Sequence, residues 1–330
     1  MVVTSIARFF YNQLFVTLPV PTGSYAGQTV VITGSNVGLG KEAARHFANL
    51  GASTIILAVR SIEKGEAAKA DIEATTHCGP GAIQVWELDM SSYASVKAFA
   101  ARVERELPRV DIFIENAGIN TATYVKAEEN ESTITVNVIS TFLLAALVLP
   151  KLKETAAKYK IRPVLSIVGS EVHGVASFPE RKRPEGKIFE ALNDEAGWDK
   201  MKGDRYPVSK LLVMLAVQAI GERYPVDSFP VTINCVNPGL CVSSLSRNRA
   251  PGSYDFQASR LARTTEHGSR AVVDGGSQGP DSHGRYVSNC LVAPSEGLAA
   301  GKERKVLQDR VWKELMEKLE SIQPGVASNF

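Results

Sequence analysis

The chain has 330 residues, of which 44% are hydrophobic and 22% charged, and its 37 basic residues nearly balance 35 acidic ones. This length can bury a sizeable core, and a net charge of +2 gives no reason to expect a nucleic acid as a partner. The four cysteines and five histidines show no spacing typical of a metal site, so we predict no metal. With no secretory signal, they favour reduced thiols and a cytoplasmic location.

Residues 1–27 form an N-terminal extension that carries an aromatic cluster, Phe9, Phe10, Tyr11 and Phe15. The extension is too short and too interrupted by polar residues to be a transmembrane span. A peripheral membrane contact is one interpretation of the aromatic residues. Because no cluster of Lys or Arg accompanies them, we favour a short amphipathic helix that docks on the body of the protein.

From residue 28 onward, short runs rich in Val and Ile alternate with segments of helix length. The runs cover 29–33, 53–59, 82–88, 110–115, 163–169, 231–237 and 284–289, and the helical segments include 38–50, 61–76, 92–107, 128–159 and 204–222. Runs that are apolar throughout are typical of strands covered on both faces. The alternation predicts an α/β fold for residues 28–330: a single-domain, Rossmann-like, doubly wound parallel sheet of about seven strands with helices on both faces.

Two stretches interrupt this alternation, at residues 171–203 and 240–283. Both are longer than ordinary connections, and long connections are often lids or binding loops. We expect both to be insertions that shape a substrate pocket.

A glycine-rich loop, TGSNVGLG at residues 33–40, places Gly34, Gly38 and Gly40 between a strand and a helix. The spacing differs from the usual G-x-G-x-x-G, but in this context glycines let the backbone approach a pyrophosphate. About 20 residues further on, the second strand ends at Arg60, where a carboxylate would instead bind a ribose hydroxyl. Because an Arg at that point accommodates a 2′-phosphate, we favour NADP(H) over NAD(H).

The pattern Tyr-x-x-x-Lys occurs twice, as Tyr93/Lys97 and as Tyr206/Lys210. Tyr93 is expected on the adenosine side of a dinucleotide and Tyr206 on the nicotinamide side, where it would open the helix after the fifth strand. A free tyrosine has a pKa near 10, and an adjacent ammonium lowers the pKa of a tyrosine. Tyr206 with Lys210 is therefore the pair that we expect to act as general acid and base near neutrality.

Together these motifs resemble the short-chain dehydrogenase/reductase family over about residues 28–245, with its T-G-x-x-x-G-x-G loop. Further elements follow in family order, although Glu115 stands where the family often has Asn. They are Asp89, Asn116-Ala117-Gly118, Asn137, Ser170, Tyr206 with Lys210, and Asn237-Pro238-Gly239. The resemblance implies that Ser170 binds the substrate oxygen, that Asn137 holds a water of the proton relay, and that Lys210 also binds the nicotinamide ribose. The implied catalytic residues are Asn137, Ser170, Tyr206 and Lys210.

The cofactor site follows from proximity to the glycine loop and from the same resemblance. Its expected members are Gly34, Ser35, Asn36, Gly38, Leu39, Gly40, Arg60, Asp89, Asn116, Ala117, Gly118, Tyr206, Lys210, Pro238, Gly239 and Ser243.

The long interval between Ser170 and Tyr206 resembles the retinol-dehydrogenase-like branch and related fungal reductases of natural-product pathways. This implies an NADP-dependent oxidoreductase that interconverts a ketone or aldehyde and an alcohol on a bulky, lipophilic small molecule such as a secondary metabolite. It also implies a homo-oligomer, a dimer or tetramer.

We expect Val172, His173, Phe178 and Trp198 to line the substrate pocket; the alternative is that they pack the insertion on its own core. Two other functions stay open: a non-catalytic NADP-binding sensor or scaffold, and an epimerase or dehydratase that uses the nicotinamide transiently.

Overall fold

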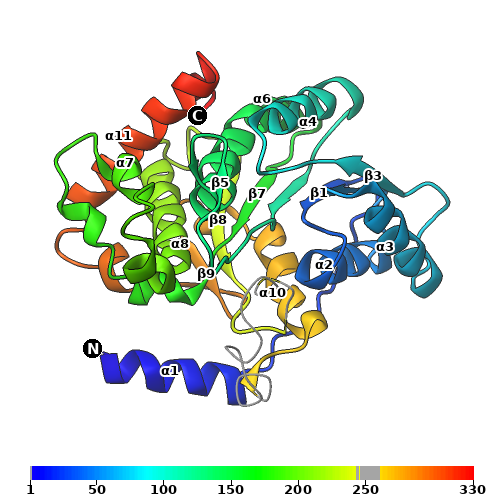
Figure 1. Ribbon diagram of the computed structural model, residues 1–330. Helices are drawn as coiled ribbons and strands as arrows, with labels where there is room; N and C mark the ends of the chain where they lie inside the picture. The colour runs from blue at the N-terminus through cyan, green and yellow to red at the C-terminus, as the bar shows by residue number, and fades with distance from the viewer. Residues whose placement is uncertain (1, 243–244, 246–260) are drawn as a thin grey trace.

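A computed structural model describes residues 2–242, 245 and 261–330 (Figure 1). Ser243, one of the expected cofactor contacts, lies outside the described residues.

The centre of the molecule is an eight-stranded sheet in the order β10-β9-β8-β7-β4-β1-β2-β3. Its strands are β1 (Thr29–Thr33), β2 (Thr54–Val59), β3 (Ile83–Glu87), β4 (Ile112–Glu115), β7 (Val164–Val168), β8 (Thr232–Asn237), β9 (Tyr286–Ser288) and β10 (Leu291–Ala293). Neighbouring strands from β3 to β9 pair in parallel, and β10 pairs with β9 in antiparallel fashion. The predicted parallel sheet is confirmed; the sequence pattern missed only the short edge strand β10.

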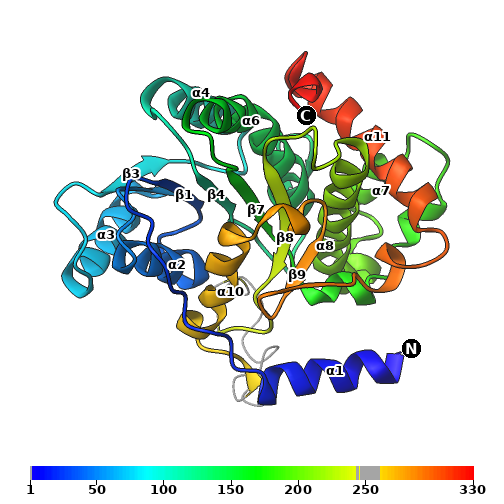
Figure 2. The ribbon, with the colours of Figure 1, turned by 180° about the vertical axis from the view of Figure 1, so that it is seen from behind.

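Helices cover both faces of the sheet (Figures 1 and 2). They are α1 (Val2–Phe15), α2 (Gly38–Asn49), α3 (Ile62–Thr75), α4 (Tyr93–Glu106), α5 (Ser132–Ile134), α6 (Ser140–Tyr159), α7 (Ile188–Leu192), α8 (Trp198–Arg223), α10 (Thr265–Ser277) and α11 (Arg304–Ile322). A π-helix (Thr135–Ile139) joins α5 to α6, a small hairpin joins β5 (Lys126–Ala127) to β6 (Asn130–Glu131), and 3₁₀ turns lie at Glu171–Val175, Pro179–Lys182, Pro280–Ser282, Gly297–Ala299 and Val326–Asn329.

Alternation along β1 shows how the sheet divides the core. Val30 and Ile32 point into an apolar cluster with residues of α2, α3 and α10, whereas Val31 points into a cluster with residues of α4, α6, α8 and α11. Successive side chains of a strand point to opposite faces, so a strand that is apolar throughout can be buried on both. This is the doubly wound arrangement that the apolar runs predict.

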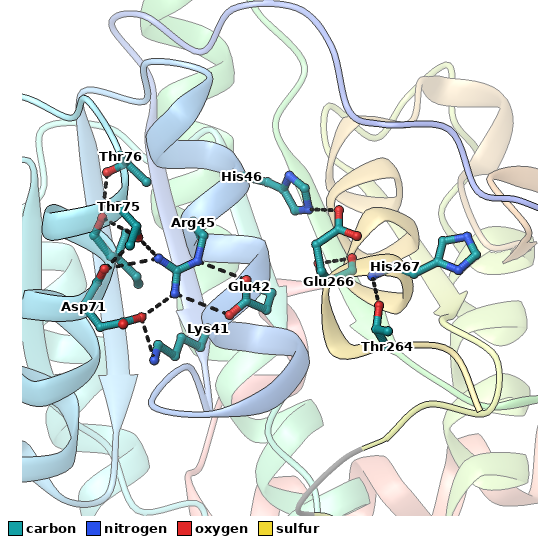
Figure 3. Close-up of polar contacts among 12 residues, drawn as sticks. Lys41, Glu42, Arg45, His46, Asp71, Thr75, Thr76, Thr264, Glu266 and His267 are labelled. Atoms are coloured by element: carbon teal, nitrogen blue, oxygen red, sulfur yellow. Dashed lines mark hydrogen bonds and ion pairs between the residues drawn. The ribbon is translucent and has the colours of Figure 1, made fainter. Parts of the chain in front are cut away.

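Helix α2, which follows the glycine loop, is held on both sides by polar contacts (Figure 3). Lys41 of α2 pairs with Asp71 of α3 at 2.8 Å, and Arg45 reaches the same carboxylate. On the other side, His46 Nε2 of α2 lies 3.3 Å from Glu266 Oε1 of α10. These contacts fix the helix whose N-terminus faces the loop.

Three expectations about helices need correction. Helix α8 begins at Trp198, so Tyr206 lies in its third turn rather than opening it, and Pro207 is inside the helix. Residues 265–277, expected within the second insertion, form α10, a buried layer against β4, β7 and β8. Helix α11 was not anticipated from the sequence.

One stretch among the described residues, Ser132–Tyr159, is long and apolar enough to cross a membrane, with a mean hydropathy of 2.0. Most of it is buried inside the chain, with 94% of its apolar window covered. This segment is therefore a buried connection between the β5–β6 hairpin and β7. The dimer or tetramer expected from the sequence stays a prediction.

Candidate active site

A large cavity of about 1950 Å³ lies at the carboxyl ends of the parallel strands, where open α/β sheets bind their ligands. Expected cofactor residues in its lining are Gly34, Asn36, Gly38, Leu39, Arg60, Asp89, Asn116, Ala117, Gly118, Tyr206, Lys210, Pro238 and Gly239. Ser170, Val172 and His173 line the same cavity. Residues that are far apart in the sequence thus meet around one space.

Glycine is needed at the three positions of the loop for different structural reasons. Gly34 and Gly38 both have φ of +65°, a left-handed conformation that glycine adopts without strain. A Cβ on Gly40 would lie 2.5 Å from the side-chain amide of Asn116 and 2.8 Å from the carbonyl of Gly34. Two glycines therefore shape the turn, while the third permits close packing behind it.

Two expected cofactor contacts do not line the cavity. The hydroxyl of Ser35 turns inward, fully buried, and donates a hydrogen bond to the carbonyl of Ile32 at 2.8 Å. Gly40 is buried beneath the loop, as its contacts show. Both residues shape the loop from behind, because a tight turn points some of its atoms toward the protein.

Asn116 and Ala117 bind the glycine loop from the neighbouring strand. The amide of Asn116 donates to the carbonyls of Thr33 and Gly34 at 2.9 and 3.2 Å, and Ala117 N–H donates to Thr33 Oγ1 at 2.9 Å. The loop after β1 and the loop after β4 are thus hydrogen-bonded to each other, at the point where the strand order of the sheet reverses direction.

The end of the cavity next to β2 and α3 carries cationic side chains. Arg60 is exposed and lines the cavity beside Ser61 and Lys64, two further possible anion ligands that the sequence motifs did not single out. Ser61 Oγ caps α3 by accepting from Lys64 N–H. Among the described residues Arg60 has no ion-pair partner, whereas Lys41 is paired with Asp71. The site leaves Arg60 available for an anion at a helix N-terminus, which itself favours negative charge.

Lys210 lies one helical turn after Tyr206, with its Nζ 5.7 Å from the centre of the Tyr206 ring. The ammonium is buried and donates to the carbonyl of Val168 at 2.7 Å. Burial lowers the pKa of Lys210 to about 8, so the side chain still carries its charge at neutral pH. A cation is therefore held beside the only Tyr-x-x-x-Lys tyrosine that lines the cavity.

The other pair behaves differently. Tyr93 at the start of α4 is buried, and its hydroxyl accepts a hydrogen bond from the side-chain amide of Asn130 at 3.0 Å. It is not part of the cavity lining, and burial raises the pKa of the Tyr93 hydroxyl.

Asn137 sits in the π-helix between α5 and α6, and such helices are frequent at functional sites. Its buried side chain does not line the cavity but binds the backbone of Ile119 and the hydroxyl of Ser209. A Cβ on Gly118 would lie 3.3 Å from Asn137 Oδ1 and 3.8 Å from Lys210 Nζ. Gly118 therefore lies between the two, and Asn137 supports the floor of the site.

The insertion after Ser170 contributes less to the lining than expected. Phe178 is fully buried and Trp198 is 6% exposed, and neither is in the cavity lining. Trp198 donates its indole N–H to the carbonyl of Ala122 and meets the ring of Tyr124 edge to face. Phe178 belongs to the apolar cluster formed with residues of α4, α6, α8 and α11. The two aromatic residues therefore pack the insertion against the body of the protein rather than lining the cavity.

His173 lines the cavity but is already engaged. Its Nδ1 is 2.7 Å from the carbonyl of Ser170, its Nε2 accepts from the N–H of Glu296, and its ring meets Tyr286 edge to face. Burial lowers the pKa of His173, which keeps the ring neutral. The ring is a brace for the turn that follows Ser170.

Glu171 is a cavity residue that the motifs did not single out. Burial, opposed by Arg263 and reinforced by Glu296, raises the pKa of Glu171 to about 7. Its N–H donates to Asn237 Oδ1 at 3.2 Å, and Asn237 also accepts from Gly239 N–H. Asn237 thereby joins the loops after β7 and β8, and a titratable carboxyl stands next to Ser170.

Comparison with known proteins agrees with this geometry. A family model described as short chain dehydrogenase matches residues 28–179. A short chain dehydrogenase/reductase (dmxR8) of Cryptosporiopsis sp. is 58% identical over 98% of this chain and 99% of its own length. A short-chain dehydrogenase (anuD) of Penicillium roqueforti is 42% identical over 98% of this chain and 85% of its own.

Solved structures show the same fold. A short chain dehydrogenase from Escherichia coli CFT073, complexed with NADPH, has a TM-score of 0.59 and 21% identity, covering 82% of this chain and 99% of its own. Another from Shigella flexneri 2a, complexed with NADP, has a TM-score of 0.56 and 19% identity, covering 82% of this chain and 100% of its own. With relatives this similar over nearly its whole length, the chain belongs to the short-chain dehydrogenase/reductase family.

Proposed function

We propose that this oxidoreductase is NADP(H)-dependent and interconverts a ketone or aldehyde and an alcohol on a bulky, lipophilic small molecule. The observation that carries the proposal is the buried ammonium of Lys210 beside Tyr206, in a cavity shared with Ser170 and the glycine loop. The residues present fit the cofactor: the left-handed glycines open a cradle, and Arg60, which has no ion-pair partner among the described residues, would face the adenosine end. The NADP and NADPH bound by the two solved relatives agree with this choice.

When bound, NADPH supplies the hydride. Tyr206 donates its hydroxyl proton to the carbonyl oxygen, and the positive charge of Lys210 stabilises the phenolate that is left. The hydroxyl of Ser170 donates a hydrogen bond to the same oxygen as negative charge develops on it. In the opposite direction Tyr206 accepts the proton of the alcohol. Asn137 positions the loop that carries Gly118, and the water of the relay would be held in its π-helix.

A cytoplasmic location is part of the proposal, supported by four cysteines that are all free.

The test is Tyr206→Phe, measured by NADPH consumption across a panel of ketones and aldehydes. General acid catalysis predicts a loss of about a hundredfold or more in kcat. NADPH affinity, followed by fluorescence titration, should stay within about twofold, since the ring is kept. Tyr93→Phe is the matched control and should keep its turnover. Undiminished turnover in Tyr206→Phe would refute the proposal.

A further inference from the structure

Helix α1 has two different faces. Phe9, Asn12 and Gln13 lie at helical spacing and are half-buried, whereas Phe10 is 42% exposed and Phe15 is 72% exposed. The family model begins at residue 28, so nothing in the family motifs accounts for this helix. Figures 1 and 2 show α1 below β8, β9 and α8, on the opposite side of the molecule from α3.

The inward face is fastened to the loop after β8. Gln13 donates to the carbonyls of Leu240 and Leu261 at 2.9 and 3.0 Å and accepts from Leu240 N–H at 3.2 Å. A Cβ on Gly239 would lie 2.7 Å from Gln13 Oε1, so the loop approaches the helix as closely as a glycine allows. The buried guanidinium of Arg263 donates to the carbonyls of both Asn12 and Pro238.

Two further contacts secure the ends of the segment. Arg8 pairs with Glu296, which follows β10, at 2.8 Å. Beyond the helix, Leu18 is fully buried, its N–H donates to His267 Nε2, and its carbonyl accepts from Arg270. The segment is therefore fastened along its length and does not lie loosely on the surface.

Arg8, Phe9 and Asn12 line the same cavity as Ser170 and Tyr206. The partners of Arg8, Asn12 and Gln13 named above follow β8 or β10, on the half of the sheet that lies across from β2 and Arg60. With the cofactor phosphate at Arg60, the part of the cavity near α1 is left for the substrate. Val175 and Leu291, both exposed, add apolar surface to this region.

We propose that α1 is a wall of the substrate site and that Phe9 is a specificity-determining residue, contacting the part of a bulky apolar substrate farthest from the reacting carbonyl. The inference rests on the proposed function, which assigns one end of the cavity to the cofactor and the other to the substrate. Phe9, Val175 and Leu291 are apolar side chains of this part of the lining, so the wall suits a ligand whose distal part is apolar.

The first test compares Phe9→Ala with Phe10→Ala, the next residue of the same helix on its outer face. The probes are cyclohexanone, 2-tetralone and 9,10-phenanthrenequinone, which have one, two and three rings. Phe9→Ala should lower kcat/KM for the three-ring probe by about tenfold, mainly through KM, because an apolar pocket contact is lost. Its kcat/KM for cyclohexanone and its NADPH affinity should match those of Phe10→Ala. Equal effects of the two substitutions on all three probes would overturn the proposal.

A second test does not need turnover, so it separates this inference from the proposed function. In Phe9→Cys and Phe10→Cys, loaded with NADP⁺ so that the ketone is not reduced, maleimide modification is followed by mass spectrometry of the α1 peptide. Saturating 2-tetralone should slow the modification of position 9 several-fold and leave position 10 unchanged. Equal rates of maleimide modification at position 9 with and without the ketone would refute the proposal that α1 is a wall of the substrate site, even if Tyr206→Phe behaved as expected. Thermal unfolding of each variant checks that α1 and its contacts remain folded.

Discussion

Asn137 and Ile119 hold one another through two hydrogen bonds: Ile119 N–H donates to Asn137 Oδ1 at 2.9 Å, and Asn137 Nδ2 donates to the Ile119 carbonyl at 2.9 Å. The same amide donates to Ser209 Oγ at 3.0 Å, one residue before Lys210. One side chain thereby joins the loop after β4 to the helix that carries Tyr206. Asn137 therefore holds the loop after β4 at a set distance from helix α8.

Replacing Asn137 with Ala should lower both activity and stability. The loss leaves buried backbone groups without partners, which costs about 1–3 kcal/mol of unfolding free energy. We expect kcat to fall at least about tenfold, because small displacements at a reacting centre are costly. Steady-state kinetics and denaturant unfolding measure the two effects. An Asn137→Ala variant with unchanged kcat and unchanged unfolding free energy would contradict this assignment.

Arg60→Ala should weaken the binding of NADPH but not that of NADH. Loss of a charge-assisted contact to the 2′-phosphate should raise the KM for NADPH by about ten- to a hundredfold, while the KM for NADH stays the same. Lys69→Ala, on α3 but outside the cavity lining, is the matched control. A parallel rise in both KM values would place Arg60 outside the phosphate site.

Arg205 is a buried guanidinium next to Tyr206, and it pairs with Glu180 at 3.2 Å and approaches Glu131 at 3.8 Å. Arg205→Met leaves two buried carboxyls without their cation, so we expect a loss of about 3–5 kcal/mol in unfolding free energy. Arg223→Met breaks an ion pair with Asp309 that is largely solvent-accessible and should cost less than about 1 kcal/mol. Chemical denaturation distinguishes the two. Similar losses in unfolding free energy for the two variants would show that the buried ion pairs of Arg205 stabilise the protein no more than the exposed pair of Arg223.

Glu171 should introduce a pH dependence into substrate binding. Its pKa of about 7 means that it is neutral in acid and gains a negative charge as the pH rises through neutrality. A charge beside an apolar carbonyl compound disfavours its binding, so the KM for an uncharged ketone should rise above about pH 7. Glu171→Gln should remove this rise, while Glu185→Gln, an exposed carboxyl paired with Lys313, should retain it. A KM profile that is unchanged in Glu171→Gln would exclude Glu171 as the source.

Glu115 should make stability depend on pH. Its two carboxyl oxygens are buried and have no hydrogen-bond partner among the described residues, and burial raises the pKa of Glu115 well above its usual range. The folded state therefore holds a proton that the unfolded state loses above about pH 4.5, so stability falls as the pH rises from there toward the folded pKa. Glu115→Gln should remove that loss and raise the melting temperature more at pH 8 than at pH 5. An equal change at both pH values would contradict a protonated Glu115.

The sequence by itself determined the sheet, its parallel order and the family. Strands such as β1 and β2 can be predicted from the sequence because a strand that is covered on both faces consists of a continuous run of apolar residues. The loop TGSNVGLG and the order of Asn116, Ser170 and Tyr206 identify the family, because this order is kept even though the interval between Ser170 and Tyr206 is long.

Only the tertiary structure decided which side chains reach the cavity. Ser35 and Gly40 face the protein, Phe178 and Trp198 pack against the body of the protein, and Glu171 faces the cavity. Nothing in their local sequence distinguishes these directions. Phe9 and Phe10 are adjacent and chemically identical, yet one lines the cavity and the other faces outward. The difference comes from long-range contacts such as Gln13 with Leu240, since the side of a helix that is buried depends on what packs against it.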